Sequence, residues 1–272
     1  MYSFAYHRAS GVEDALQRLS ADPAAKLIAG GMTLLPVMKH RMAAPSLLVD
    51  IGALKDLRGI TLQGDVLTVG AAMRHREIAE DALVVQSVAA LAQCARSIGD
   101  PQVRSRGTLG GAIANNDPAA DFPAAVLGLK GVVVTDRRSI ADGAYFLDMY
   151  TTALEEGEIV TAVRFCKPVR AAYEKFPNPA SGYAMAGVFV AEFDEAGSKQ
   201  VRVAVTGAAP FVFRWTDAER ALSQAFSVQS LATLELPAQG LNSDLHASAA
   251  YRAHLVRVMA MRAVAQLTGE TV

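Results

Sequence analysis

The first fifty residues alternate between short apolar runs and segments in which apolar residues recur at helical spacing. The apolar runs 26–29 and 47–51 predict buried strands, and the segments 11–19 and 34–42 predict helices beside them. Ser10 is expected to cap the first helix with Glu13 completing a capping box, and Thr33 is expected to cap the second. The chain therefore opens with a small α/β unit.

The pattern changes to a mixture of strands and helices between residues 57 and 165. The segment 57–71 predicts two strands joined by a turn at Gln63-Gly64-Asp65, and 76–98 predicts mostly helix. The stretch 102–106 is expected to be extended, 119–127 to be helical, and 131–135 and 159–165 to be strands.

Prolines and glycines cluster between residues 168 and 182, which predicts a domain boundary there. Beyond it, 183–193 and 200–205 alternate like antiparallel strands around an Ala196-Gly197 turn, and 217–225, 228–234 and 247–267 predict helices. We expect a three-stranded sheet with helices on one face. The predicted parts are 1–55, 56–170 and 171–272, and the fold class is α+β.

Composition excludes several classes of protein. Apolar residues make up 51% and charged residues 19% of the 272 residues, and the net charge is −1, which disfavours nucleic acid as a partner. The sequence predicts no signal peptide and no integral membrane segment. The two cysteines, Cys94 and Cys166, are too few to ligate an iron–sulfur cluster, and they favour a cytoplasmic location. No motif predicts catalytic residues or a metal site.

Two glycine turns are the strongest candidates for binding chemistry. Each of Ala29–Thr33 and Thr108–Gly111 follows apolar residues and is expected to bare consecutive backbone N–H groups, which suit an anion such as the diphosphate of a dinucleotide. Neither turn fits the Rossmann or P-loop fingerprint. Asp121 lies one helical turn beyond Asp117, where it serves either as a helix cap or as an acceptor for ligand hydroxyls.

These motifs carry a family resemblance. Ala-Gly-Gly-x-Thr-Leu-Leu-Pro at 29–36, Arg-x-x-Gly-Thr-Leu-Gly-Gly at 104–111 and Asp-Pro-x-x-Asp at 117–121 resemble those of the FAD-binding medium subunits of molybdenum hydroxylases. That family includes the flavoproteins of carbon monoxide dehydrogenase and xanthine dehydrogenase. The resemblance implies an FAD-binding domain of the para-cresol methylhydroxylase type in two subdomains, followed by a smaller C-terminal α+β domain.

The resemblance also implies which residues hold a noncovalent FAD. Those expected at the pyrophosphate and its adjoining ribose are Lys26, Leu27, Ile28, Ala29, Gly30, Gly31, Met32, Thr33 and Leu34. Those expected on the other side of the phosphates are Gly107, Thr108, Gly110 and Gly111.

The remaining implied residues contact the other parts of the cofactor. Asp121 is expected to bind the ribityl hydroxyls, Ile98 to lie against the isoalloxazine, and Ile159 and Val160 to enclose the adenine. Lys175 and Tyr183 are expected to approach the flavin from the second domain. Relatives often carry Asn where this chain has Ala112, and Asn115 is the candidate to compensate.

The implied function is electron transfer. An FAD-binding subunit of this family receives electrons from the [2Fe-2S] clusters of a small partner subunit and passes them to a terminal acceptor. A large molybdopterin-binding subunit oxidises the substrate, and the assembly is a dimer of heterotrimers. Two alternatives stay open at the level of the sequence: a stand-alone flavin oxidase or dehydrogenase with its own substrate site, and a nucleotide-binding subunit that has lost FAD.

Overall fold

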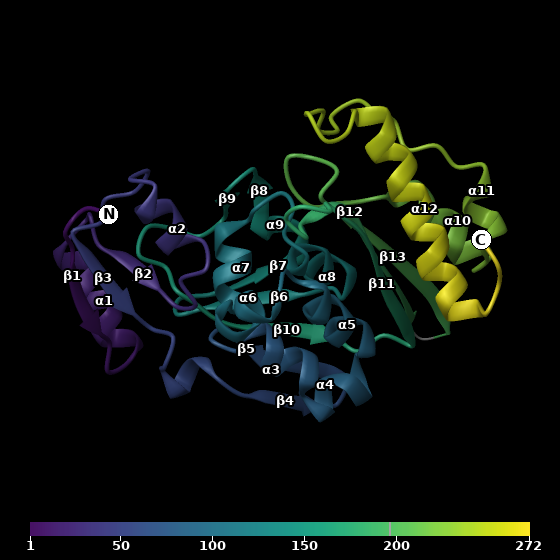
Figure 1. Cartoon of the computed structure of the whole chain (residues 1–272). Coiled ribbons are helices and arrows are strands. Elements are labelled where there is room, and N and C mark those ends of the chain that lie inside the picture. The colour runs from purple at the N-terminus through teal and green to yellow at the C-terminus, as the bar shows by residue number, and fades with distance from the viewer. Residues whose placement is uncertain (196) are drawn as a thin grey trace.

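The computed structural model describes residues 1–195 and 197–272, which form an α+β fold whose successive parts lie side by side (Figure 1). At the N-terminal end, three parallel strands make a sheet of order β1-β3-β2. Its elements are β1 (Ala5–Arg8), α1 (Val12–Ala21), β2 (Lys26–Ile28), α2 (Leu34–Lys39) and β3 (Leu47–Asp50). We call this part the N-terminal lobe.

The expected side-chain caps in the N-terminal lobe are wrong. Gly11 takes the N-cap position of α1, and the capping box of Ser10 with Glu13 does not form. Asp14 instead accepts hydrogen bonds from the backbone N–H and the hydroxyl of Ser10, at 2.8 and 3.1 Å. Thr33 does occupy the N-cap position of α2, but its side chain makes no capping hydrogen bond.

The central part contains a five-stranded antiparallel sheet of order β4-β5-β10-β6-β7. Its strands are β4 (Ile60–Gln63), β5 (Val66–Gly70), β6 (Val132–Thr135), β7 (Ser139–Ala141) and β10 (Val160–Cys166). A separate hairpin pairs β8 (Phe146–Asp148) with β9 (Thr151–Thr152). The predicted turn at residues 63–65 is confirmed, because β4 and β5 pair directly across it.

Helices of the central part cover this sheet and lead to the second glycine turn. They are the 3-10 turn η1 (Lys55–Leu57), α3 (His75–Glu80), α4 (Ala82–Ser87), α5 (Ala89–Ser97), α6 (Pro101–Arg106), α7 (Leu109–Asn115), α8 (Phe122–Gly128) and α9 (Asp142–Tyr145). The expectation that 102–106 is extended is wrong. Asp100 accepts a hydrogen bond from the N–H of Val103, and Pro101 sits at the first helical position, so the segment starts a helix.

The C-terminal part has four antiparallel strands in the order β11-β12-β13-β14, one more than predicted. The strands are β11 (Arg170–Pro177), β12 (Ala184–Glu195), β13 (Ser198–Thr206) and β14 (Phe213–Arg214). The expected Ala196-Gly197 turn includes a residue outside the described part. Strand β11 lies within the proline-rich stretch that predicted only a boundary. It forms because residues 170–177 pair along the length of β12.

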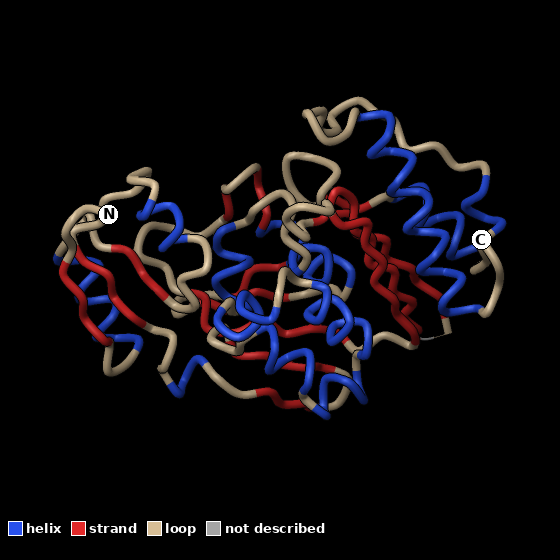
Figure 2. The backbone as a smooth tube through the Cα atoms, in the orientation of Figure 1, coloured by secondary structure: helices blue, strands red, loops and turns tan. Residues whose placement is uncertain are grey.

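Helices cover both faces of this C-terminal sheet (Figure 2). On one face pack α10 (Thr216–Gln224) and α12 (Ala249–Thr268), with α11 (Gln229–Ala232) against them. On the other face pack α5 and α8 from the central part, so the prediction of helices on one face is incomplete. Every residue of α8 is buried, and its apolar side chains join one core with Phe189 and Ala204 of the C-terminal sheet. The central and C-terminal parts are therefore fused by a shared core.

The N-terminal lobe has a core of its own. Ala15, Val49 and Leu54 belong to it, and Ala72 and Ile159 of the central part complete it. The lobe is therefore joined to the rest of the chain through few apolar residues. None of the helices in the described ranges has both the length and the apolar character needed to cross a bilayer.

Candidate functional site

A cavity of about 1220 Å³ lies between the N-terminal lobe and the central part. This volume exceeds the ~300–1,000 Å³ typical of small-molecule pockets, as an extended ligand requires. The expected cofactor residues at its wall are residues 26–34, Ile98, Gly107, Thr108, Gly110, Gly111, Asn115, Asp121, Ile159, Val160 and Tyr183. The cavity thus brings together residues from all three predicted parts of the chain.

The first glycine turn supplies free backbone donors to this cavity. The turn joins β2 to α2, and Gly31 has φ +72°, a conformation that favours glycine. No acceptor in the described part of the chain takes the N–H groups of Gly30, Gly31, Met32 or Thr33, although all four residues line the cavity. Four successive free donors suit an anionic ligand such as a diphosphate.

Gly30 also allows the two sides of the cavity to touch. A Cβ atom built on Gly30 would lie 2.2 Å from the carbonyl oxygen of Arg106 and 2.8 Å from the Cα of Gly107. Neither contact is with a flexible side chain, so a larger residue would force the N-terminal lobe away from the central part. Gly30 is therefore required where the first glycine turn contacts residues 106–107, a contact that sets the width of the cavity.

The second glycine turn does not bare its donors, which corrects the prediction. The N–H of Leu109 donates to the carbonyl of Met73 at 3.0 Å, and that of Gly110 to Ala71 at 2.8 Å. The N–H of Gly111 donates to the Thr108 hydroxyl at 3.2 Å, which caps α7. These glycines instead allow close approach.

Each glycine of this second turn has a different neighbour. A Cβ on Gly110 would lie 2.6 Å from the Cβ of Ala71. Gly111 is exposed, and a Cβ there would meet only the Thr108 hydroxyl, at 2.9 Å. Gly110 therefore packs the turn against the central sheet, whereas Gly111 leaves room in the cavity.

Asp121 is a buried carboxylate at the cavity wall, 4% exposed. Its side chain makes no capping hydrogen bond to α8, so the helix-cap alternative is wrong for this residue. Its Oδ1 accepts a hydrogen bond from the Tyr173 hydroxyl at 2.5 Å, and the Lys175 ammonium lies 3.0 Å away. Burial raises the pKa of Asp121, while Lys175 and Tyr173 act to lower it.

Lys175 is not among the lining residues. Its ammonium donates to the carbonyl of Ser97 at 2.9 Å and to Asp121 at 3.1 Å, which turns it behind the cavity wall. The structure therefore brings Tyr183 to the cavity from the C-terminal part but holds Lys175 one layer back.

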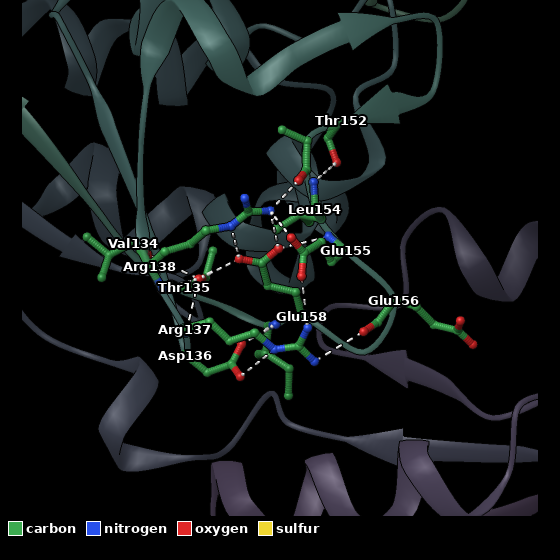
Figure 3. A network of polar contacts seen from close by, with 12 residues as sticks. Val134, Thr135, Asp136, Arg137, Arg138, Thr152, Leu154, Glu155, Glu156 and Glu158 are labelled. Carbon is green, nitrogen blue, oxygen red and sulfur yellow. Dashed lines mark hydrogen bonds and ion pairs between the residues drawn. The ribbon is translucent and has the colours of Figure 1, made fainter.

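At its other end the cavity is lined by apolar residues and also by the charged residues Asp136, Arg137 and Glu158, which belong to a network of polar contacts. Ile159 and Val160, which are 1% and 6% exposed, line this end at the start of β10. The N–H of Ile159 donates to the carboxylate of Asp136 at 2.7 Å. Beside it, Glu158 binds Arg138 at 2.9 Å, as Figure 3 shows.

The ion pair between Glu158 and Arg138 belongs to a wider set of contacts. Glu158 also accepts hydrogen bonds from the Thr135 hydroxyl at 2.7 Å and from the N–H of Glu155 at 2.8 Å. Hydrogen bonding to Arg138 is the main reason why the pKa of Glu158 falls to about 2. These contacts join the loop 154–158 to the end of β6, which fixes this end of the cavity (Figure 3).

No sequence pattern pointed to His75, which lines the cavity at the start of α3. Its ring is 4% exposed, contacts Phe122 with ring centroids 5.2 Å apart, and lies so close that a Cβ on Gly107 would be 2.5 Å from Nε2. Burial, followed by the nearby charge of Arg104, lowers the pKa of His75 to about 4. A neutral imidazole therefore forms this part of the wall.

Asn116 is a second residue that sequence reasoning missed. The neighbouring Asn115 lines the cavity, as expected. Asn116 is 1% exposed in the left-handed conformation, and its amide donates to the carbonyls of Asp148 and Thr151 at 2.8 and 2.9 Å. It thereby ties the end of α7 to the β8–β9 hairpin. An Asn at a helix end is a usual carrier of this conformation, which is the signal that was available.

The chemistry of the site is that of binding. The free N–H donors fit the diphosphate of FAD. The buried carboxylate of Asp121 can accept hydrogen bonds from the ribityl hydroxyls, and the apolar side chains of Ile159 and Val160 fit the adenine. No group of three or more His, Cys, Asp or Glu side chains in residues 1–195 and 197–272 is placed to hold a metal ion.

Two family models match the chain and together cover almost all of it. Residues 2–168 match the FAD binding domain in molybdopterin dehydrogenase, and residues 171–267 match the CO dehydrogenase flavoprotein C-terminal domain. The chain is 35% identical to the nicotine 6-hydroxylase medium subunit of Paenarthrobacter nicotinovorans, covering 98% of both chains. It is 34% identical to the carbon monoxide dehydrogenase medium chain of Hydrogenophaga pseudoflava, covering 96% of both.

Solved structures agree with these matches. The fold is similar to a chain of reconstituted CO dehydrogenase from Oligotropha carboxidovorans, with a TM-score of 0.89, 30% identity and 99% of both chains covered. It is also similar to a chain of quinoline 2-oxidoreductase from Pseudomonas putida 86, with a TM-score of 0.87, 26% identity and coverage of 97% and 96%.

Proposed function

The chain belongs to the family of FAD-binding medium subunits of molybdenum hydroxylases, and we propose that it binds one noncovalent FAD in the cavity and relays electrons. The observation that carries this proposal is the row of free N–H donors at residues 30–33 in a cavity that also holds Asp121 and apolar side chains. Bound FAD supplies the ability to accept and release one or two electrons, and the protein supplies binding and orientation.

The proposed roles follow the chemistry of each part of the wall. Residues 26–34 hold the pyrophosphate and its adjoining ribose, and Ile159 and Val160 enclose the adenine. Gly107, Thr108, Gly110 and Gly111 pack against the other side of the phosphates by close approach. Asp121 and Asn115 accept hydrogen bonds from the ribityl chain, and Ile98 and Tyr183 contact the isoalloxazine.

The proposed assembly follows from the relatives. We place the chain between a small subunit with [2Fe-2S] clusters and a terminal acceptor, in a complex whose large molybdopterin subunit oxidises the substrate. The proposed complex is a dimer of heterotrimers in the cytoplasm. The proposed organisation of the chain is two FAD-binding subdomains, 1–55 and 56–170, followed by a flavoprotein domain, 171–272.

Binding is tested by the visible absorption and FAD stoichiometry of the purified chain, for which we expect one FAD per chain. Gly111→Val should abolish binding by filling the cavity at an exposed position, and the melting temperature of the FAD-free chain shows how far the Thr108 cap of α7 is disturbed. Full yellow colour and unchanged FAD affinity in the variant would show that this turn does not contact the phosphates.

Electron relay is tested by anaerobic mixing of the flavoprotein with substrates of the relatives, such as nicotine and carbon monoxide, while flavin bleaching is followed. We expect no bleaching until partner subunits with iron–sulfur clusters and molybdenum cofactor are added. Bleaching by the chain alone at a rate that matches turnover would instead assign a substrate site to this chain and refute the relay.

A further inference from the structure

The polar contacts of Asp121 link three elements: the start of α8, strand β11 and the end of α5. Tyr173 and Lys175 lie two residues apart on β11, so both side chains project from the same face of that strand. The Tyr173 hydroxyl donates to Asp121 at 2.5 Å, and the Lys175 ammonium lies within 3.1 Å of both carboxylate oxygens. The ammonium also donates to the carbonyl of Ser97 at the end of α5, at 2.9 Å.

The charges in this set balance each other away from water. The side chains of Lys175 and Asp121 are 6% and 3% exposed, so removing either partner leaves an uncompensated buried charge. The other titratable groups that face Asp121 are uncharged at neutral pH, because burial raises the pKa of the Cys94 thiol and of the Tyr173 and Tyr183 hydroxyls. Lys175 is therefore the cation that opposes the effect of burial on the pKa of Asp121.

Both anchors of Lys175 lead to the cavity, although Lys175 itself does not line it. Asp121 is at the wall, and Ser97 directly precedes Ile98, which is also at the wall. A single ammonium thus fixes a polar and an apolar wall residue, and it does so from the C-terminal part of the chain. A direct contact between Lys175 and a ligand would require breaking this buried ion pair.

We propose that Lys175 and Tyr173 are positioning residues that act on FAD through Asp121. Lys175 keeps the carboxylate ionised, and Tyr173 fixes its orientation, so that Asp121 presents a charged acceptor to the ribityl hydroxyls. This inference rests on the proposed binding of FAD in the cavity. It assigns Lys175 an indirect role, which differs from a direct contact with the flavin in a measurable way.

A double-mutant cycle distinguishes the two roles. FAD affinity is measured by flavin fluorescence for the wild-type chain, Lys175→Met, Asp121→Asn and the double variant. We expect each single variant to weaken FAD binding by about ten- to hundredfold. In the double variant, loss of Lys175 should add less than about twofold to the effect of Asp121→Asn, because an amide needs no counter-ion. A direct contact predicts instead that the two losses multiply, and that outcome overturns the inference.

The pH profile supplies a readout that a purely structural role does not change. Without the Lys175 ammonium, burial raises the pKa of Asp121 further. The FAD hydroxyls bind the ionised carboxylate more strongly than the protonated one, so FAD affinity follows the ionisation of Asp121. The affinity of Lys175→Met for FAD should therefore rise with pH, whereas the affinities of wild type, Lys175→Arg and Asp121→Asn stay constant. A flat profile for Lys175→Met overturns the inference.

Further variants keep the test informative. Tyr173→Phe should weaken binding several-fold with a flat pH profile, since the charge balance is kept. Lys199→Met is the matched control, because Lys199 is an exposed lysine on the same sheet whose partner, Glu192, keeps its second ion pair with Arg170. If Lys175→Met does not fold, the double variant should fold, and its failure to do so overturns the inference. Absence of FAD binding in the wild-type chain would refute the proposed function itself.

Discussion

His75 gives the stability of the chain a pH dependence that a single substitution should remove. In the unfolded chain its pKa is near the ordinary 6.5, whereas burial lowers it to about 4 in the folded chain. The unfolded state therefore binds an extra proton between these two values, so stability falls as the pH falls from about 6.5 to about 4. The gap between the two pKa values corresponds to about 3 kcal/mol.

The perturbation is His75→Gln, which keeps a neutral polar side chain but cannot take up a proton in this range. The variant loses the ring contact with Phe122, which lowers stability by an amount that does not depend on pH. Between pH 7 and pH 4, the free energy of unfolding of wild type should therefore fall by about 3 kcal/mol more than that of the variant.

The assay is urea denaturation of the FAD-free chain at intervals of half a pH unit from 4 to 7.5. Carboxylates titrate in both proteins and cancel in the difference. His254→Gln is the control, because His254 is exposed on α12. Parallel curves for wild type and His75→Gln across this range would refute the reasoning and show that His75 is solvated in the folded protein.

Three further substitutions test other parts of the cavity. Gly30→Ala should weaken FAD binding about tenfold or more, because the added Cβ forces the N-terminal lobe away from the central part. Gly143→Ala is the control, because a Cβ there meets nothing within 4 Å; equal FAD affinities of the two variants would contradict the prediction. Asn116→Ala should lower the free energy of unfolding by about 2 kcal/mol in urea denaturation, and an unchanged value would show that the hairpin does not need its amide. Glu158→Gln should lower the free energy of unfolding by about 1–3 kcal/mol at pH 7, because it weakens the pairing with Arg138. This loss should shrink as the pH drops from about 4.5 toward 2, where Glu158 becomes protonated. Urea denaturation measures the loss, and a loss that does not depend on pH would contradict the prediction.

Local interactions made much of the fold predictable. The strands at 26–29, 47–51 and 131–135 were found because each coincides with a short apolar run. The prediction that the first of them is buried is wrong, because β2 lies at the edge of its sheet and none of its residues is buried. The turn at Gln63-Gly64-Asp65 was found because Gly and Asp favour a tight turn wherever they occur. Strand β11 was missed because Pro168, Pro177 and Pro179 signal a break, although residues 170–177 pair with the next strand along the chain.

The sequence also determined which residues form the cavity, through motifs whose residues stay close along the chain. Residues 29–33 follow a strand and precede a helix, so their backbone donors are exposed by local geometry alone. Only the tertiary structure decided that the backbone N–H groups of the second turn are hydrogen-bonded within the protein. The carbonyls that take the N–H groups of Leu109 and Gly110 belong to Met73 and Ala71, about forty residues earlier in the chain, and no local pattern records that pairing.

The tertiary structure likewise decided what Asp121, Lys175 and His75 do. In the sequence each is a polar residue with several ordinary roles, because its pKa and its partners are set by burial and by groups distant along the chain. Folding places Asp121, at the start of α8, next to Lys175 and Tyr173 of β11, and removes His75 from water. A motif can indicate which residue faces a ligand, but the charge of that residue depends on its neighbours in space.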